Sequence, residues 1–133
     1  MAKVKTGELI DAALDWAVGV AEGRQPGAYK GVVRATAHPD CPDSAPMFGP
    51  ELNYSTDWAQ AGPIIRREGI STRLNHKQAQ LWEAYIWLPT QHDQSEADSN
   101  SYTAFGTTAL QAAMRCHVLS KLGDTVEVPD ELL

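Results

Sequence analysis

The chain has 133 residues, of which 43% are hydrophobic and 21% charged, a composition typical of a single globular domain, residues 1–133. Its formal net charge of -6 argues against binding to duplex nucleic acid, because neutralising a phosphate backbone requires a basic face. No apolar stretch is long enough to span a membrane, and the two cysteines, Cys41 and Cys116, favour reduced thiols over a disulfide framework. We therefore expect a cytoplasmic protein.

An amphipathic helix is predicted near the start, over residues 8–22. Its apolar side chains recur at spacings of three and four: Leu9, Ala12, Ala13, Trp16, Ala17 and Val20. Thr6 is the predicted cap and Gly23 the predicted stop. Because Trp16 lies on the apolar stripe, we interpret it as a core residue.

Prolines and glycines interrupt residues 24–53, where one short strand over residues 30–35 is predicted before a long loop. In that loop, His38 and Cys41 have a two-residue gap that zinc ligands often use. Cys116 and His117 could complete a set of ligands, but adjacent residues of a helix point apart. We therefore predict no metal site and no cofactor.

The stretch from Tyr54 to Ile65 concentrates unusual residues and is the predicted site. Ser55 or Thr56 can cap a helix, with Asp57 in its first turn. Tyr54 and Trp58 offer flat apolar faces beside the free N–H groups of the helix start. Gly62 and Pro63 allow another backbone to come close. The pattern suits a small anionic or planar ligand, and it suits core packing equally well.

Two arginines and two predicted strands follow this stretch in the chain. Arg66 and Arg67 end the second helix at Gly69, where they either lie on the solvated surface or bind a phosphate or carboxylate. Residues 70–74 and 81–88 alternate apolar and polar side chains and predict two antiparallel strands. The second strand turns Glu83, Tyr85 and Trp87 away from its apolar side. Another helix, a ligand or the second subunit of a homodimer could cover that aromatic face.

The last part of the chain predicts a polar loop over residues 90–103 and a final helix capped by Thr107 or Thr108. His117 lies on the apolar stripe of this helix, which favours a packed histidine over a catalytic one. The tail, residues 126–133, is extended and acidic. The predicted fold class is α+β, with helices on a small antiparallel sheet: a helix-strand-strand-helix core plus an N-terminal helix.

Several of these segments together resemble the phage NinX family, small proteins from the nin region of lambdoid phages. The resemblance is carried by Tyr54–Ile65, Trp82 and the closing run Leu110–Asp124, and the opening also matches in Lys3–Thr6 and Leu14–Val18. The middle is similar to phage helix-sheet-helix sandwich domains. The proline-rich loop and residues 90–103 depart from the family pattern. The resemblance implies a phage accessory protein, and it supplies no catalytic residues.

Enzymatic function is not predicted, because the chain has no glycine-rich phosphate loop, nucleophile elbow or His-Glu metal helix. The favoured hypothesis is binding of a small nucleotide-like ligand, such as a cyclic nucleotide or ADP-ribose immune signal that the protein sequesters in the host cytoplasm. The predicted binding residues are Tyr54, Ser55, Thr56, Asp57, Trp58, Gly62, Pro63, Arg66 and Arg73. The alternative is a protein-interaction module that modulates a host or phage replication or recombination protein.

Overall fold

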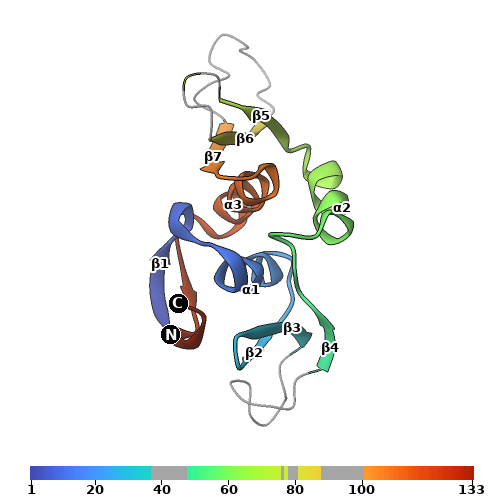
Figure 1. The fold of residues 1–133 in the computed structure, drawn as a ribbon, viewed down its shortest axis with the longest axis vertical. Helices are drawn as coiled ribbons and strands as arrows, with labels where there is room; N and C mark the ends of the chain where they lie inside the picture. Colours follow the sequence, from blue (N-terminus) through green and yellow to red (C-terminus); the bar gives the residue numbers. More distant parts are fainter. Residues whose placement is uncertain (37–47, 76, 78–80, 88–100) are drawn as a thin grey trace.

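The computed structural model describes residues 1–36, 48–75, 77, 81–87 and 101–133 (Figure 1). Within them it contains three α-helices, α1 (Asp11–Ala21), α2 (Trp58–Glu68) and α3 (Ala109–Leu122). The strands are β1 (Ala2–Lys5), β2 (Gly27–Tyr29), β3 (Val32–Thr36), β4 (Phe48–Glu51), β5 (Ser71–Leu74), β6 (Trp82–Trp87), β7 (Ser101–Gly106) and β8 (Thr125–Val128). All strand pairs are antiparallel, so the predicted α+β class is confirmed. No helix among the described residues is long and apolar enough to cross a membrane.

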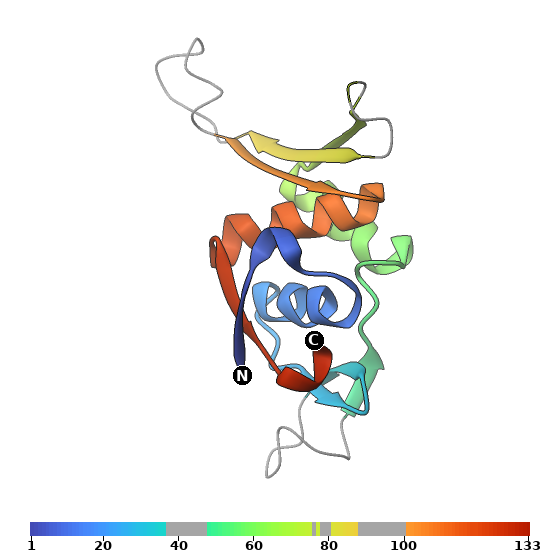
Figure 2. The ribbon, with the colours of Figure 1, turned by 60° about the vertical axis from the view of Figure 1, so that its left-hand side comes forward.

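Helix α3 lies at the centre of the molecule, between the sheet β5-β6-β7 and helix α1 (Figure 2). Its buried residues are Leu110, Ala112, Ala113, Met114, Cys116, His117 and Val118. Thr108 caps it, because the Thr108 hydroxyl accepts a hydrogen bond from the Gln111 N–H at 3.0 Å. The Gln111 side chain accepts one in return from the N–H of Thr107, the residue before the cap, at 2.8 Å. One of the two predicted caps is therefore confirmed.

The sheet that covers α3 has the strand order β5-β6-β7. Both predicted strands are confirmed, and Ala84 and Ile86 of β6 are buried as expected. Strand β7 was not predicted, and its first residues were assigned to the polar loop. Tyr102 and Ala104 of β7 point inward, but the alternation of apolar and polar side chains around them is too weak to predict a strand from the sequence. Residues 88–100 lie outside the described residues.

The first helix begins later than predicted. A short 3-10 turn, η1 (Thr6–Glu8), precedes it, and Ile10 occupies the N-cap position without a side-chain cap. Thr6 bonds to the end of α3 instead. Its hydroxyl donates to the Gly123 carbonyl at 2.6 Å, and its N–H donates to the Asp124 carbonyl at 2.7 Å. The predicted Thr6 cap is therefore wrong, because this side chain joins the start of the chain to the end of α3.

The two ends of the described chain are paired as strands. β1 runs antiparallel to β8, with Ala2 opposite Val128, and both termini lie close together (Figure 1). Val126 and Val128 are buried, which explains why a tail predicted only as extended forms regular structure. A second 3-10 turn, η3 (Asp130–Leu132), follows.

The third sheet, β2-β3-β4, packs below α1 in Figure 1. The predicted strand over residues 30–35 overlaps β3 but starts too early. Lys30 and Gly31 instead form the turn between β2 and β3, both with positive φ, 53° and 78°. His38 and Cys41, the pair with zinc-like spacing, lie outside the described residues.

Helix α2 is confirmed, but its cap differs from the prediction. Asp57 occupies the N-cap, and its carboxylate accepts the Ala59 N–H at 2.9 Å, where Ser55 or Thr56 was expected. Gly69 ends the helix with φ 66°, as predicted. The helix continues through Pro63, and it buries only Ala61 and Ile64.

Candidate functional site

A hollow of about 660 Å³ lies beside the carboxyl end of β7. The turn η1, the start of α1 and one side of α3 form its other walls. Its lining combines apolar side chains with hydroxyl, carboxylate and guanidinium groups, a mixture typical of ligand sites. None of the nine predicted binding residues lines it.

Among the residues that the structure describes, Arg115 is the only basic one that lines this hollow. Its Nε donates to the Leu9 carbonyl at 2.8 Å and its Nη1 donates to the Phe105 carbonyl at 2.7 Å. It makes no ion pair with any residue that the structure describes. Burial lowers the pKa of Arg115, since partial desolvation disfavours the charged form. An anion in the hollow would supply the charge that this guanidinium lacks.

The turn from β7 into α3 forms the wall next to Arg115. Gly106 is required there, because a Cβ atom at this position would lie 2.7 Å from the Ala112 nitrogen. Thr107 follows and places the start of α3 at the hollow, where the helix dipole favours negative charge. Phe105 also lines the hollow, and its ring, which is 45% exposed, lies on the outer side of β7. A planar group could stack there.

Two carboxylates, Asp11 and Asp124, line the opposite part of the hollow. Asp11 is the first residue of α1 and has φ 47°, a left-handed conformation that aspartate adopts more readily than most residues. Both side chains are exposed, and neither forms an ion pair within the described part of the chain. Carboxylates in this position can accept hydrogen bonds from hydroxyl or amino groups of a ligand.

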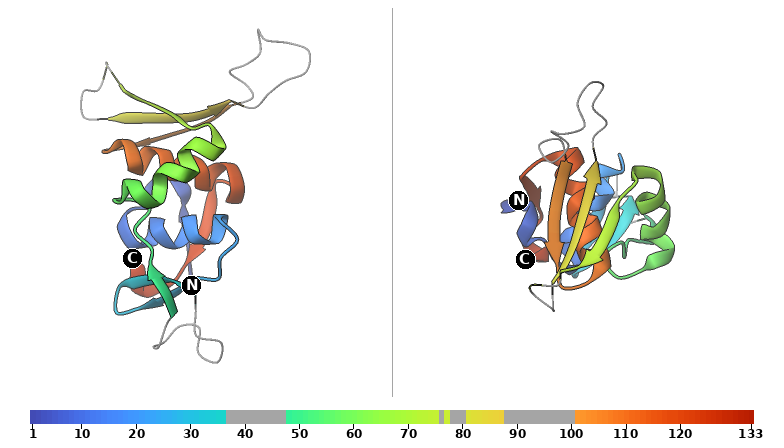
Figure 3. Two further views of the ribbon diagram at one scale, coloured as in Figure 1. Left: turned by 90° about the vertical axis from the view of Figure 1, so that its right-hand side faces the viewer. Right: turned by 90° about the horizontal axis from the view of Figure 1, so that it is seen from above.

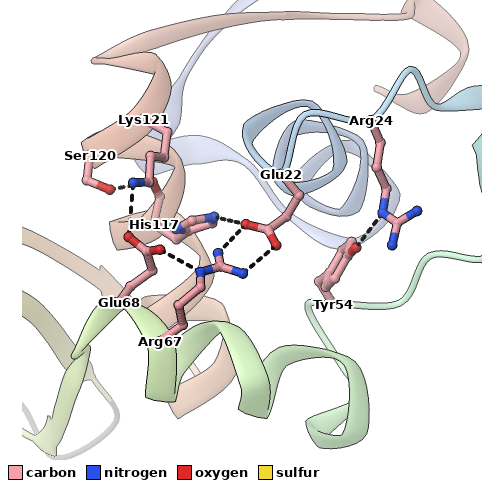
Figure 4. Close-up of polar contacts among 8 residues, drawn as sticks. All are labelled: Glu22, Arg24, Tyr54, Arg67, Glu68, His117, Ser120 and Lys121. Atoms are coloured by element: carbon pink, nitrogen blue, oxygen red, sulfur yellow. Dashed lines mark hydrogen bonds and ion pairs between the residues drawn. The ribbon is translucent and has the colours of Figure 1, made fainter.

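Two of the predicted binding residues, Tyr54 and Ser55, are buried. The Tyr54 hydroxyl accepts a hydrogen bond from Arg24 Nε at 3.2 Å (Figure 4), and the Ser55 N–H donates to the Asp15 carboxylate at 2.7 Å. Burial raises the pKa of Asp15 to about 6, and the hydrogen bond from the Ser55 N–H opposes only part of that shift. These contacts hold the loop before α2 against α1, and the Tyr54 ring offers no open face to a ligand.

The other predicted residues occupy three separate places. Thr56 is exposed, Asp57 caps α2, and Trp58 is 58% exposed. Because the Asp57 carboxylate already occupies the start of α2, it disfavours an anion there.

Farther along α2, Gly62, Pro63 and Arg66 line a second hollow together with Arg67. Arg73 lies elsewhere, on β5, where its Nη2 is 3.3 Å from Glu83 Oε2 and its guanidinium carbon is 5.9 Å from the Tyr85 ring centre. The predicted set therefore does not form one pocket.

A cluster of charged side chains joins α2 to the other two helices (Figure 4). Arg67 donates to both oxygens of Glu22, at 3.0 and 2.5 Å, and its Nε lies 2.8 Å from Glu68. Lys121 Nζ lies 3.0 Å from the same Glu68 carboxylate. His117 Nε2 is 2.9 Å from Glu22 and its ring is fully buried, as expected for a packed histidine. We call these five residues the charged clasp.

The charges of the clasp are balanced internally. Burial raises the pKa of Glu22, but hydrogen bonds from Arg67 and His117 outweigh it, so the net shift is downward. The Arg67 hydrogen bond likewise lowers the pKa of Glu68. Burial lowers the pKa of His117 despite the neighbouring Glu22, so its neutral form donates from Nε2. Arg67 is therefore fully engaged within the protein.

Cys116 is a buried thiol in α3 whose Sγ lies 3.4 Å from the Tyr102 carbonyl. Burial raises its pKa to about 12, so it is a poor nucleophile. Across the described residues, His, Cys, Asp and Glu side chains form no group of three that could hold a metal ion.

Comparison with known proteins identifies the family. A family model described as bacteriophage P22 NinX matches residues 5–121. The chain belongs to the NinX family. A search of curated proteins finds no match. The NinX match spans all three helices and most of the large hollow, including Phe105 and Arg115.

Sequence reasoning missed the residues that make this hollow in the NinX chain. Thr107 was considered only as a possible helix cap, and Phe105, Gly106 and Arg115 were not singled out. One signal was present, since Arg115 interrupts a run of small and apolar residues within α3. A charged residue inside such a run requires a specific partner.

Proposed function

We propose that this phage accessory protein is a non-enzymatic binder of a small nucleotide-like ligand, and that the ligand occupies the hollow beside β7 and α3. One observation carries the proposal: Arg115 is partly desolvated in the hollow beside β7 and has no carboxylate partner among the described residues. Binding of an anionic group would compensate that half-buried charge.

The remaining walls suit the other parts of a nucleotide. The exposed ring of Phe105 can stack against a base, while Asp11 and Asp124 can accept hydrogen bonds from ribose hydroxyls. The volume of about 660 Å³ lies in the range of small-molecule sites. For a phage protein, one use of such binding is to sequester a cyclic nucleotide or ADP-ribose immune signal of the host.

A thermal-shift screen against nucleotides, cyclic dinucleotides and ADP-ribose derivatives tests the proposal. A ligand at a hundred times its dissociation constant should raise the free energy of unfolding by about 2.7 kcal/mol. Arg115→Met should abolish this stabilisation, and Phe105→Ala, which alters an exposed ring, should weaken it without unfolding the protein.

Arg66→Met is the matched control, because it removes an arginine from another surface. The proposal fails if none of these compounds stabilises the protein. It also fails if Arg66→Met or Trp58→Ala abolishes binding while Phe105→Ala does not, a result that would favour the site predicted from sequence.

The outer face of the sheet favours a second candidate function, protein interaction. No described helix covers this face, which looks toward the viewer in the right panel of Figure 3. It carries Tyr85 and Phe105, with Glu83 opposite Phe105 in the register. A second subunit is one candidate partner. If Tyr85→Ser lowers the molar mass measured by light scattering from dimer to monomer, this face is a homodimer interface.

A further inference from the structure

The outward face of α2 carries an exposed aromatic residue. Trp58 is 58% exposed, the largest value among the described tryptophan and phenylalanine side chains that remain exposed. Gly62 and Arg66 follow it at intervals of four residues, so the three lie along one side of the helix. Eight residues of α-helix place Trp58 and Arg66 about 12 Å apart along the axis.

The surface at Gly62 is hollowed. Gly62, Pro63, Arg66 and Arg67 line a hollow of about 550 Å³. Apart from the two neighbouring residues and the backbone of α2 itself, no heavy atom lies within 4 Å of the place where a Gly62 side chain would begin. A side chain of another molecule can therefore reach the helix backbone at Gly62.

Arg66 is the basic side chain of this face that remains available. Arg67 is held by Glu22 and Glu68 within the charged clasp, whereas Arg66 makes no ion pair with any described residue. Its side of α2 therefore offers one uncompensated positive charge in a chain of net charge -6.

We infer that Trp58, Gly62, Pro63 and Arg66 form a docking surface for a segment of a partner protein that carries an apolar side chain and an acidic one. Tryptophan and arginine are the residues that most often dominate the energy of protein interfaces. The apolar side chain would pack on Trp58 and the hollow, and the carboxylate would pair with Arg66.

The local charges favour a protein over a nucleic acid. Binding to a phosphate backbone gains affinity from several uncompensated cations, whereas this surface offers one, since Arg67 is paired with Glu22 and Glu68. The spacing of about 12 Å corresponds to two turns of a partner helix or about four residues of an extended strand. This surface is separate from the hollow of Arg115, so the inference does not depend on the proposed ligand.

Site-directed cross-linking in infected cells tests this inference. The photoreactive residue p-benzoylphenylalanine replaces Trp58 in the full chain, and the same replacement of Leu74, which is 39% exposed on β5, is the control. We expect position 58 to give a discrete adduct with one protein, cross-linked in a segment that contains an acidic residue, and position 74 to give none.

The partner so identified is then purified and its affinity measured by calorimetry. Arg66→Glu should weaken binding at least tenfold, whereas Lys77→Glu, which makes the same charge change on an exposed residue elsewhere, should leave binding unchanged. Reversing the acidic residue of the partner should restore affinity for Arg66→Glu. The inference is overturned if position 58 gives no adduct, if the adduct is nucleic acid or a second copy of this chain, or if Arg66→Glu binds normally.

Discussion

Helices α2 and α3 show two different ways in which this chain attaches a helix. Seven residues of α3 are buried between the sheet and α1, whereas α2 buries only Ala61 and Ile64. Near its carboxyl end α2 is fastened by Arg67 and Glu68 of the charged clasp (Figure 4). Helix α3 is therefore held in place by apolar burial. Helix α2 depends on electrostatic contacts and leaves most of its surface available for other molecules.

The largest loss of stability is expected when apolar contacts of α3 are removed. Met114 is fully buried, so Met114→Ala should lower the free energy of unfolding by about 3 kcal/mol, since it loses the transfer energy and leaves a cavity. The partly buried Ile65 of α2 is the matched position, and Ile65→Ala should cost about 1 kcal/mol. Urea denaturation measures both. Equal losses would contradict the difference between the two helices.

A second effect comes from Asp15, which holds the loop that leads into α2. Its folded pKa of about 6 lies above the ordinary value of 3.8, so its contribution to stability is present below pH 3.8 and lost as pH rises through 6. Asp15→Asn keeps an acceptor for the Ser55 N–H but carries no charge. It should therefore raise the free energy of unfolding at pH 8 by about 2 kcal/mol.

Denaturation curves at pH 4 and pH 8 check the sign of this effect. At pH 4, where the wild-type carboxyl is largely protonated, the gain should nearly disappear. Asp124→Asn changes an exposed carboxylate and should show no comparable gain. A loss of stability at pH 8 in Asp15→Asn would show that the charged form is required.

The charged clasp itself should contribute less. The pKa of Glu22 is lowered in the folded state, so its stabilisation is present above the ordinary value of 4.5 and lost as pH falls through the folded pKa. Glu22→Gln should cost about 1 kcal/mol at pH 7 and less at pH 3. Glu127→Gln, which changes an exposed carboxylate of β8, should be neutral at both pH values. A cost for Glu22→Gln that persists at pH 3 would exclude an electrostatic role.

The smallest effect is expected at Trp58. Because its side chain is largely exposed, Trp58→Ala should change the free energy of unfolding by less than about 0.5 kcal/mol. Thermal denaturation checks this value. A larger loss would mean that the indole packs within the fold and is not available to a partner.

Much of the fold could be predicted from the sequence where local signals are strong. The apolar spacing of α1, the glycine that ends α2 and the threonine that caps α3 each act within a few residues. Strands β1 and β8 could not be paired in advance, because their contact joins opposite ends of the chain and neither strand has enough residues to show a pattern. The same holds for Thr6, whose partner lies 117 residues away.

The candidate site was harder to predict for a related reason. Its hollow combines η1 and α1 with β7 and α3, so the lining residues become neighbours only after folding. Tyr54 looked like a ligand-binding aromatic, yet it is buried, because an aromatic side chain serves core and site equally well. Trp58 carries the same chemical signal and is exposed. Sequence alone does not separate these two positions, which depend on how the loop before α2 packs on α1.

The pairing of β1 with β8 sets the timing of folding during synthesis. Strand β1 precedes all three helices in the chain, but its partner, Thr125–Val128, follows only after them. At a synthesis rate of about 5–20 residues per second, β1 waits on the order of ten seconds with its backbone unpaired. Lys3 and Lys5 lie on the exposed side of β1, and charged side chains of this kind oppose premature association with other chains.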